Sequence, residues 1–284
     1  MPRIGPYTLH TIETGRFRLD GGAMFGIVPR PLWERRILPD SQNRIPLNMR
    51  CLLLESSDRL ILIDDGLGDK FNKRFEELYG VDYNNFELHA SLKTAGFHAD
   101  DVTDVVLTHL HFDHCGGSTR RDGNELKPTF DRAVYHVQKG HWDWATNPNV
   151  RERGSFLKEN FIPLQAACQI DLIDGDTMLF PGIEVINIHG HTEAQQMVKI
   201  RGEEGTLVYV ADLLPTHAHL GLAWGMSYDI RPLVTSEEKA RFLDEACEGG
   251  WHLFFEHDPK VEVSGLVRTS KGVFSQHERT LLDL

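Results

Sequence analysis

The chain has 284 residues, of which 40% are hydrophobic and 25% are charged, so it is long enough to bury a large core without disulfides or a partner. Its formal net charge of −12, from 30 basic and 42 acidic side chains, argues against a nucleic-acid-binding protein, because phosphate contacts rely on Lys and Arg. Histidine is the unusual component: the chain has 15, and eleven of them lie between His109 and His257.

Cysteine usage and the N-terminus bear on the compartment. The four cysteines, Cys51, Cys115, Cys168 and Cys247, form no CxxC pair, which is typical of reduced thiols. The first residues do not resemble a signal peptide, and no apolar run is long enough for a membrane span. We therefore expect a soluble cytoplasmic protein that does not bind membranes. No repeat or linker divides the chain, so one domain over residues 1–284 is predicted.

The predicted elements alternate between strands and helices along the chain. A loop at about 20–37 comes first, because its Gly and Pro residues disfavour regular structure. Short β-rich apolar runs predict strands at 51–55, 59–64, 104–108, 133–137, 177–180, 183–188, 207–210, 252–256 and 260–267. Helical patterns predict helices at 70–79, 87–95, around His141, and at 156–167 and 236–248. For the last of these, Thr235 and Glu238 predict a capping box and Gly249-Gly250 a stop. This mixture indicates an α/β sandwich.

A dense group of potential metal ligands follows the strand at 104–108. His109, His111, Asp113 and His114 lie within six residues. In an extended chain, positions i and i+2 share a face, so His109 and His111 can point the same way. Burying so many imidazoles with a carboxylate is costly unless cations or hydrogen bonds compensate. The loop is therefore predicted to bind metal.

The run HLHFDH resembles the HxHxDH signature of the metallo-β-lactamase superfamily. Later members of that pattern follow in family order, each at a predicted strand end: His191 in Gly190-His191-Thr192, then Asp212, then His257 in Glu256-His257-Asp258. Asp64 matches an acidic position of the superfamily whose side chain supports the metal ligands without binding the metal itself. The resemblance implies an αββα sandwich, with two mixed β-sheets flanked by helices.

The resemblance also implies a two-metal site. One metal would take His109, His111 and His191, the other Asp113, His114 and His257, and Asp212 would bridge them. Imidazole and carboxylate ligands suit Zn²⁺ first, and also Fe, Mn or Co. Such metals lie roughly 3.5–4 Å apart and lower the pKa of a bound water from 15.7 to about 7. Asp113 would hold or relay a proton, and Asp64 would accept a hydrogen bond from a ligand imidazole.

The N-terminal stretch from Asp20 to Trp33 resembles the N-acyl homoserine lactonase branch, including YtnP-like quorum-quenching lactonases. This implies a hydrolase in which metal-bound hydroxide opens lactones or cleaves related small esters, and a homodimer. Two departures stand out. Homoserine lactonases carry a tyrosine three residues after the bridging aspartate, where this chain has Pro215. The glycine-containing turn after the third ligand is Thr192-Glu193-Ala194 here.

Apolar loops supply the candidate substrate contacts. Small-molecule sites are mostly apolar with a few polar groups. The candidates are Met24, Phe25, Ile27, Trp33, Trp224 and His219. For the N-terminal loop, a pocket wall, a subunit interface and core packing are equally compatible with the sequence.

Other activities within the resemblance stay open. A mono-iron oxygenase of the persulfide dioxygenase kind shares the first motif, and thioester or phosphotriester hydrolysis belongs to the same superfamily. A non-enzymatic sensor would need a broken ligand set, and none of the seven residues is missing.

Overall fold

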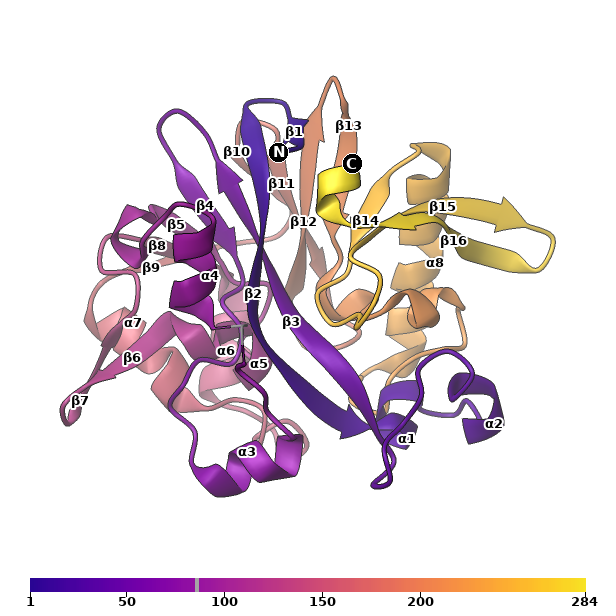
Figure 1. Ribbon diagram of the computed structural model, residues 1–284, viewed down its shortest axis with the longest axis horizontal. Helices are drawn as coiled ribbons and strands as arrows, with labels where there is room; N and C mark the ends of the chain where they lie inside the picture. The colour runs from indigo at the N-terminus through magenta and orange to yellow at the C-terminus, as the bar shows by residue number, and fades with distance from the viewer. Residues whose placement is uncertain (85–86) are drawn as a thin grey trace.

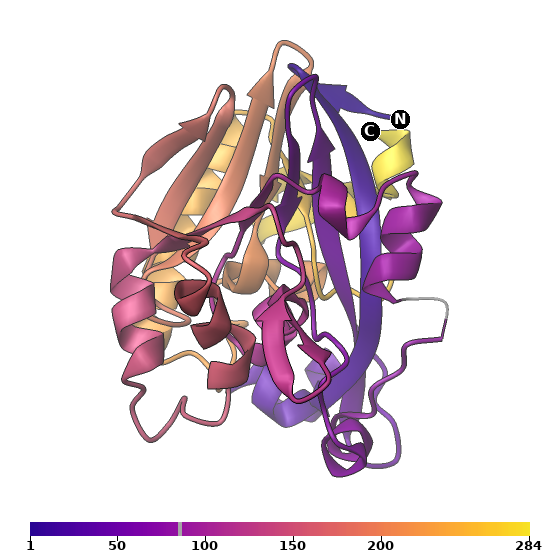
Figure 2. The same cartoon turned by 90° about the vertical axis from the view of Figure 1, so that its left-hand side faces the viewer.

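In the computed structural model, which describes residues 1–84 and 87–284, two seven-stranded sheets pack face to face between layers of helices (Figure 1). Both sheets are mixed, with parallel and antiparallel neighbours. This confirms the predicted αββα sandwich. The view at right angles shows the two sheets as adjacent layers, with helices on the outside (Figure 2).

The first sheet has the order β1-β2-β3-β4-β5-β8-β9. Its strands are β1 (Arg3–Ile4), β2 (Tyr7–Asp20), β3 (Arg44–Glu55), β4 (Leu60–Ile63), β5 (Asp104–Val106), β8 (Val134–Gln138) and β9 (Ile170–Ile173). The four strands from β4 to β9 run parallel to one another. Because the carboxyl ends of parallel strands meet at one edge, the residues that follow β4 and β5 lie close together there.

The second sheet has the order β10-β11-β12-β13-β14-β15-β16. Its strands are β10 (Thr177–Phe180), β11 (Ile183–Ile188), β12 (Gln195–Gly202), β13 (Gly205–Tyr209), β14 (His252–Phe254), β15 (Val263–Thr269) and β16 (Gly272–Arg279). Here β13 and β14 form the parallel pair, so the segments that follow them also share an edge. A separate small hairpin is formed by β6 (Thr119–Asp122) and β7 (Glu125–Pro128).

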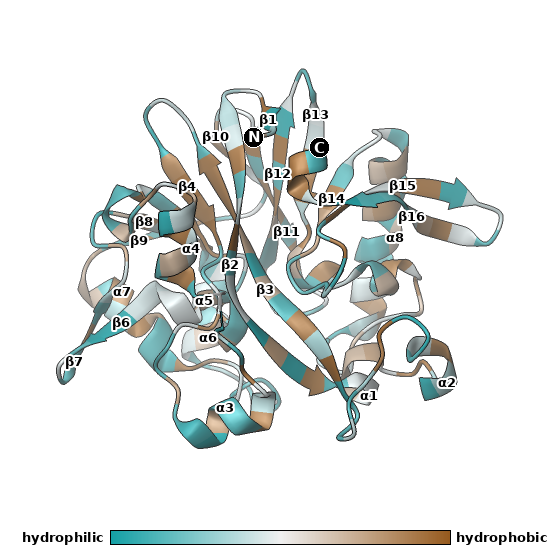
Figure 3. Cartoon of the chain, viewed as in Figure 1, coloured by the Kyte–Doolittle hydropathy of each residue, from teal (hydrophilic) through white to brown (hydrophobic). Residues whose placement is uncertain are grey.

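The core explains why the strands of the first sheet are apolar on both faces. Leu52 and Leu54 of β3 pack between the two sheets, whereas Leu53, which lies between them in the chain, packs under the helices. Successive side chains of a strand point to opposite faces, so a sheet covered on both sides reads as a continuous apolar run. In Figure 3 the hydrophobic residues concentrate accordingly on the strands.

Helices flank the two sheets, and the short helix α5 contains two of the predicted ligands, Asp113 and His114. The α-helices are α1 (Gly21–Phe25), α2 (Arg30–Trp33), α3 (Lys73–Tyr79), α4 (Leu88–Thr94), α5 (Phe112–Cys115), α6 (Lys139–Thr146), α7 (Ile162–Ala166) and α8 (Pro232–Glu248). The 3₁₀ helices are η1 (Ala99–Asp101), η2 (Gly116–Ser118), η3 (Lys158–Asn160), η4 (Ala211–Leu213), η5 (His217–Leu220) and η6 (Leu281–Asp283). Within the described ranges no helix has the length and apolarity to span a membrane.

Helix α8 corrects one local prediction. It begins at Pro232, four residues before the predicted start, and Thr235 lies inside it with its Oγ1 bonded to Arg231 O. The capping box is therefore wrong. The carboxylate of Glu238 instead accepts hydrogen bonds from the backbone N–H groups of His189 and Gly190, at 2.7 and 3.0 Å. The predicted stop is confirmed, since the helix ends before Gly249.

Two further predictions change in detail. The helix predicted at 156–167 is the 3₁₀ turn η3 followed by the short α7, which begins next to Pro163 as its ring and missing N–H require. The segment at 20–37 is not a plain loop, because it contains α1 and α2. Asp20 caps α1 by accepting from Ala23 N at 2.8 Å, and the packing of Phe25 against Trp33 holds the two turns together.

Candidate metal centre

Seven predicted ligands come from four segments that meet at one edge of the two sheets. His109 and His111 lie in the loop after β5, and Asp113 and His114 lie in α5. The others are His191 after β11, Asp212 in η4 after β13, and His257 after β14. All seven residues are buried, with no more than 8% of any one of them exposed. The structure thus brings together every residue of the set.

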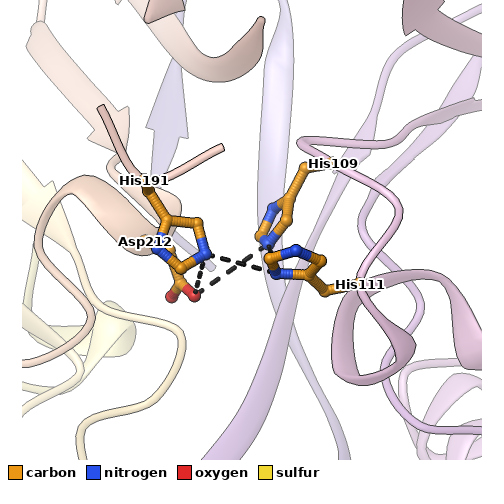
Figure 4. A group of neighbouring side chains, drawn as sticks. All are labelled: His109, His111, His191 and Asp212. Atoms are coloured by element: carbon orange, nitrogen blue, oxygen red, sulfur yellow. Dashed lines mark hydrogen bonds and ion pairs between the residues drawn. The ribbon is translucent and has the colours of Figure 1, made fainter. Parts of the chain in front are cut away.

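His109, His111, His191 and Asp212 form the first group (Figure 4). His111 Nδ1 lies 3.0 Å from His109 Nε2 and 3.2 Å from His191 Nε2. Asp212 Oδ2 lies 3.2 Å from His191 Nε2 and 3.9 Å from His109 Nε2. Four potential ligand atoms therefore lie within 4.8 Å of one another.

Asp113, His114 and His257 form the second group. The Nε2 atoms of His114 and His257 are 3.1 Å apart, and Asp113 Oδ2 lies 3.9 and 3.7 Å from them. Asp212 also reaches this group: its Oδ2 is 3.6 Å from His114 Nε2 and its Oδ1 is 3.4 Å from His257 Nε2. One carboxylate therefore contacts both groups.

The outward nitrogens of four of the imidazoles each face an oxygen acceptor. For His109 it is Thr108 Oγ1 at 3.1 Å, for His114 it is Asp64 Oδ2 at 3.0 Å, for His191 it is Asp229 Oδ1 at 3.1 Å, and for His257 it is Asn48 O at 2.8 Å. An acceptor at Nδ1 places the proton on that nitrogen and leaves the lone pair on the inward Nε2. The four rings are thus held in the tautomer that a metal ligand needs.

Asp64 and Glu256 both approach His114 from behind. Asp64 Oδ2 and Glu256 Oε2 each lie 3.0 Å from His114 Nδ1, and both carboxyl groups are fully buried. Burial and the neighbouring Glu256 raise the pKa of Asp64 to about 7, against the opposing hydrogen bond from His114. Asp64 also accepts from Thr108 N and Thr108 Oγ1, both at 2.7 Å, so it connects the loop after β4 to the loop after β5.

The electrostatics of the cluster fit a bound cation. Burial and the surrounding imidazoles lower the pKa of His109 well below its usual range, so this ring is neutral. Burial raises the pKa of Asp212, but His191, His257 and His114 outweigh it, so the carboxyl pKa is lowered and the group stays ionised. Asp212 Oδ1 is also buried without a hydrogen-bond partner among the described residues. Converging lone pairs with an unsatisfied carboxylate oxygen suit a divalent cation.

His141 supports the ligand loop without belonging to the cluster. Its Nε2 accepts from Leu110 N at 2.8 Å and its Nδ1 donates to Glu193 O at 2.6 Å. Burial lowers its pKa to about 3, so it is neutral and can serve both bonds. It therefore fixes the backbone between His109 and His111.

A cavity of about 220 Å³ opens onto the cluster. Besides His111, Asp113, His191, Asp212 and His257, its lining residues are Leu19, Met24, Leu47, Tyr79, Phe112, Arg151, Glu152, Ser155, Met226, Ser227 and Tyr228. The wall is largely apolar, with two phenols and one guanidinium among its polar groups. This composition is typical of a small-molecule site.

The predicted substrate contacts occupy different places. Met24 lines this cavity. Phe25 and Trp33 are buried in the core beneath it, and Ile27 is 88% exposed. His219 is buried with its Nε2 bonded to Met24 O at 2.9 Å. Trp224 lines a separate groove of about 610 Å³ between α8 and the β15–β16 hairpin. Of the six candidates, Met24 lines the cavity over the cluster, and the other five are not among its lining residues.

Sequence reasoning missed the residues that contact the candidate ligands from outside the cluster. Asp229 and Glu256 face ligand nitrogens, and Tyr228 lines the cavity. Glu256 directly precedes a predicted ligand, which is a usable signal. Asp229 and Tyr228 come from a loop with no local motif, and only the tertiary structure reveals their place.

The fold and the cluster together define a metallohydrolase-like centre. The family model described as the metallo-beta-lactamase superfamily matches residues 46–246, so the chain belongs to that superfamily. It is 26% identical over 175 residues to an N-acyl homoserine lactonase of Bacillus cereus. The match covers 58% of this chain and 63% of that relative, so the chain spans less than two thirds of the relative's length.

Two solved structures share the fold over nearly the whole chain. A probable metal-dependent hydrolase from Staphylococcus aureus superposes with a TM-score of 0.89 and 25% identity, covering 98% of this chain and all of the other. AidC, a dizinc quorum-quenching lactonase in complex with a product, superposes with a TM-score of 0.81 and 22% identity, covering 99% and 97% of the two chains.

Proposed function

We propose that the chain is a two-metal hydrolase that opens lactones of the N-acyl homoserine lactone kind or cleaves related small esters. The observation that carries this proposal is Asp212, whose two oxygens contact both groups of ligand atoms in a buried site beside an apolar cavity. The relative named as an N-acyl homoserine lactonase supports the choice of substrate.

The proposed ligands follow the two groups. His109, His111 and His191 would hold one metal, Asp113, His114 and His257 the other, and Asp212 both. We propose zinc in both positions, and the donor set also fits Fe, Mn or Co. When bound, such ions supply hydroxide from water at neutral pH and polarise the carbonyl that is attacked.

We assign proton transfer and the positioning of the ligand rings to carboxylate side chains of the chain. Asp113 borders the cavity with its side chain 11% exposed, so it can accept the proton released as water attacks and pass it to the departing alkoxide. Asp64 and Asp229 hold the rings of His114 and His191 through their Nδ1 atoms. Fixed rings keep the ligand lone pairs aimed inward throughout the reaction.

Tyr228 is proposed as the phenol that Pro215 cannot supply. It lines the cavity with Asp113 and Tyr79 and is 38% exposed. Partial desolvation raises the pKa of its phenol to about 12, with the charges of Tyr79, Asp20 and Asp113 adding to the effect. It is therefore a protonated donor at neutral pH. Its loop is held in place on both sides, since Ser227 N donates to Ala23 O at 2.7 Å and Met226 N to Asp229 Oδ2 at 3.1 Å.

The cavity wall favours an apolar substituent on the substrate. Leu19, Met24, Leu47, Phe112 and Met226 supply aliphatic, thioether and aromatic surface next to the cluster. An acyl chain gains roughly 0.8 kcal/mol for each methylene that it buries in such a wall. The chain's net charge of −12 disfavours polyanionic substrates.

The test is a substrate panel run on purified protein with measured metal content. Acyl homoserine lactones of several chain lengths, aryl esters, thioesters and phosphotriesters would be compared at equal zinc loading. Lactone opening that rises with acyl length over the short chains supports the proposal. Lactones and esters left intact by protein carrying two metals per chain would refute it.

The number and identity of the metals bound per chain also distinguish a two-metal hydrolase from the mono-iron oxygenase. One iron per chain, with Asp113, His114 and His257 not engaged, would favour an oxygenase. The homodimer implied by the resemblance stays a prediction, which the molecular mass in solution tests.

A further inference from the structure

His111 differs from the other four imidazoles of the cluster. It turns Nδ1 inward and Nε2 outward, whereas the others turn Nε2 inward. Its Nε2 is buried and has no hydrogen-bond partner in the part of the chain that the structure describes. The other four outward nitrogens face acceptors at 3.1 Å or less. The carboxylate Oε1 of Glu152 lies 3.7 Å from His111 Nε2.

The carboxylate of Glu152 is buried beside the cluster and hydrogen-bonded at both oxygens. The residue is 3% exposed, although a buried carboxylate is costly unless hydrogen bonds and charge compensate. Its Oε1 accepts from Thr192 Oγ1 at 2.6 Å, and its Oε2 accepts from Trp144 Nε1 at 2.7 Å and Asn149 Nδ2 at 2.6 Å. Three donor side chains therefore fix both carboxylate oxygens, and the imidazole of His111 lies opposite them.

The segment that carries Glu152 is attached to the first ligand group at several points. Thr192 directly follows the ligand His191. The guanidinium of Arg151 donates to the carbonyls of Ser227 and Asp229, and Asp229 accepts from His191. Phe156 packs against the His111 ring, with ring centroids 4.8 Å apart. Glu152 thus connects His111 with the segment around His191.

We propose that Glu152 is a positioning residue for the metal held by His109, His111 and His191. It accepts the Nε2–H of His111, which fixes that ring with Nδ1 toward the metal and makes Nδ1 a stronger ligand. This inference rests on the proposed metal centre. The proposal requires the 3.7 Å separation between these atoms to shorten to about 3.2 Å or less, the range of an N–H···O hydrogen bond.

The test is a metal titration of Glu152→Gln beside two other variants. Glu159→Gln is the matched control, because Glu159 pairs with Arg121 at the surface, away from the cluster. Asp64→Asn acts directly on His114 of the second group, and reaches His109 of the first group only through Thr108. Zn²⁺ affinities would be measured by calorimetry, and the absorption spectrum of Co²⁺-loaded protein would tell the two sites apart.

Glu152→Gln should weaken one of the two sites about 10- to 100-fold, which is the usual cost of removing an outer partner of a ligand histidine. Asp64→Asn should weaken the other site, and Glu159→Gln neither. Unchanged affinities in Glu152→Gln would overturn the inference, even if its metal-free form were less stable. Equal weakening of both sites would also overturn it, since that indicates a general structural effect.

Wild-type protein that binds no metal would overturn the metal centre itself, and the inference with it. If Glu152→Gln does not fold, Trp144→Phe removes one donor to the carboxylate and keeps an aromatic ring at that position. It should weaken the same site a few-fold, and no change at that site would overturn the inference.

Discussion

Replacing Asp212 by alanine is the most direct test of the two-metal arrangement. The carboxylate lies 3.2 to 3.9 Å from nitrogens of His191, His257, His114 and His109, so both groups lose their shared anion at once. Removing one partner of a buried charge pair costs about 3–5 kcal/mol. At 1.4 kcal/mol per factor of ten, metal affinity should fall by about two to four orders of magnitude.

The assay is competition with a chelator of known affinity, followed by elemental analysis and lactone hydrolysis. Asp244→Ala is a suitable control, because it removes an exposed carboxylate that pairs with Arg268 and belongs to neither group of candidate ligands. Asp212→Ala should release metal at chelator concentrations that leave the control loaded, and hydrolysis should be lost. Two metals retained at parental affinity would refute the bridging role of Asp212.

Tyr228, His219 and the metal centre each offer a further measurable test. Tyr228→Phe should lower kcat by about 100-fold with metal content unchanged, because one donor to developing charge is lost; unchanged steady-state kinetics would remove Tyr228 from the mechanism. Burial, with Lys239 nearby, lowers the pKa of His219 to about 4, so the unfolded state binds the extra proton between about pH 6.5 and 4. Stability should fall over that window by about 3 kcal/mol as the pH drops, and urea unfolding of His219→Phe should show a smaller fall. Removing metal with EDTA should lower Tm, since a ligand at 1,000 times its Kd stabilises by about 4 kcal/mol; an unchanged melting curve would contradict a metal bound by the folded state.

Local pattern was enough to name the candidate ligand residues that the structure brings together. Ligand chemistry depends on residue type, and a cluster such as His109 to His114 at a strand end has few structural explanations. Many strands were also predictable from the sequence, because a sheet that is covered on both faces has continuous apolar runs such as Leu52 to Leu54. Boundaries were less predictable: β3 extends back to Arg44 because it pairs with β2, a strand that local composition did not reveal.

The tertiary structure decided what surrounds the ligands. Glu238 is an instance: sequence suggested a helix cap, and the fold uses its carboxylate to hold the backbone before His191. Asp229 and Glu152 approach the cluster from loops distant in sequence from the rings that they face.

The sequence by itself determined the fold class, the superfamily and the set of candidate ligands, because these depend on local periodicity and on residue types in a fixed order. The tertiary structure alone decided the ring orientations, the acceptors behind them and the cavity wall. These depend on side chains from separate segments packing within a few ångströms, which no local pattern records. Ile27 illustrates the difference, since its apolar type suggested substrate contact and its 88% exposure depends on how α1 and α2 fold back.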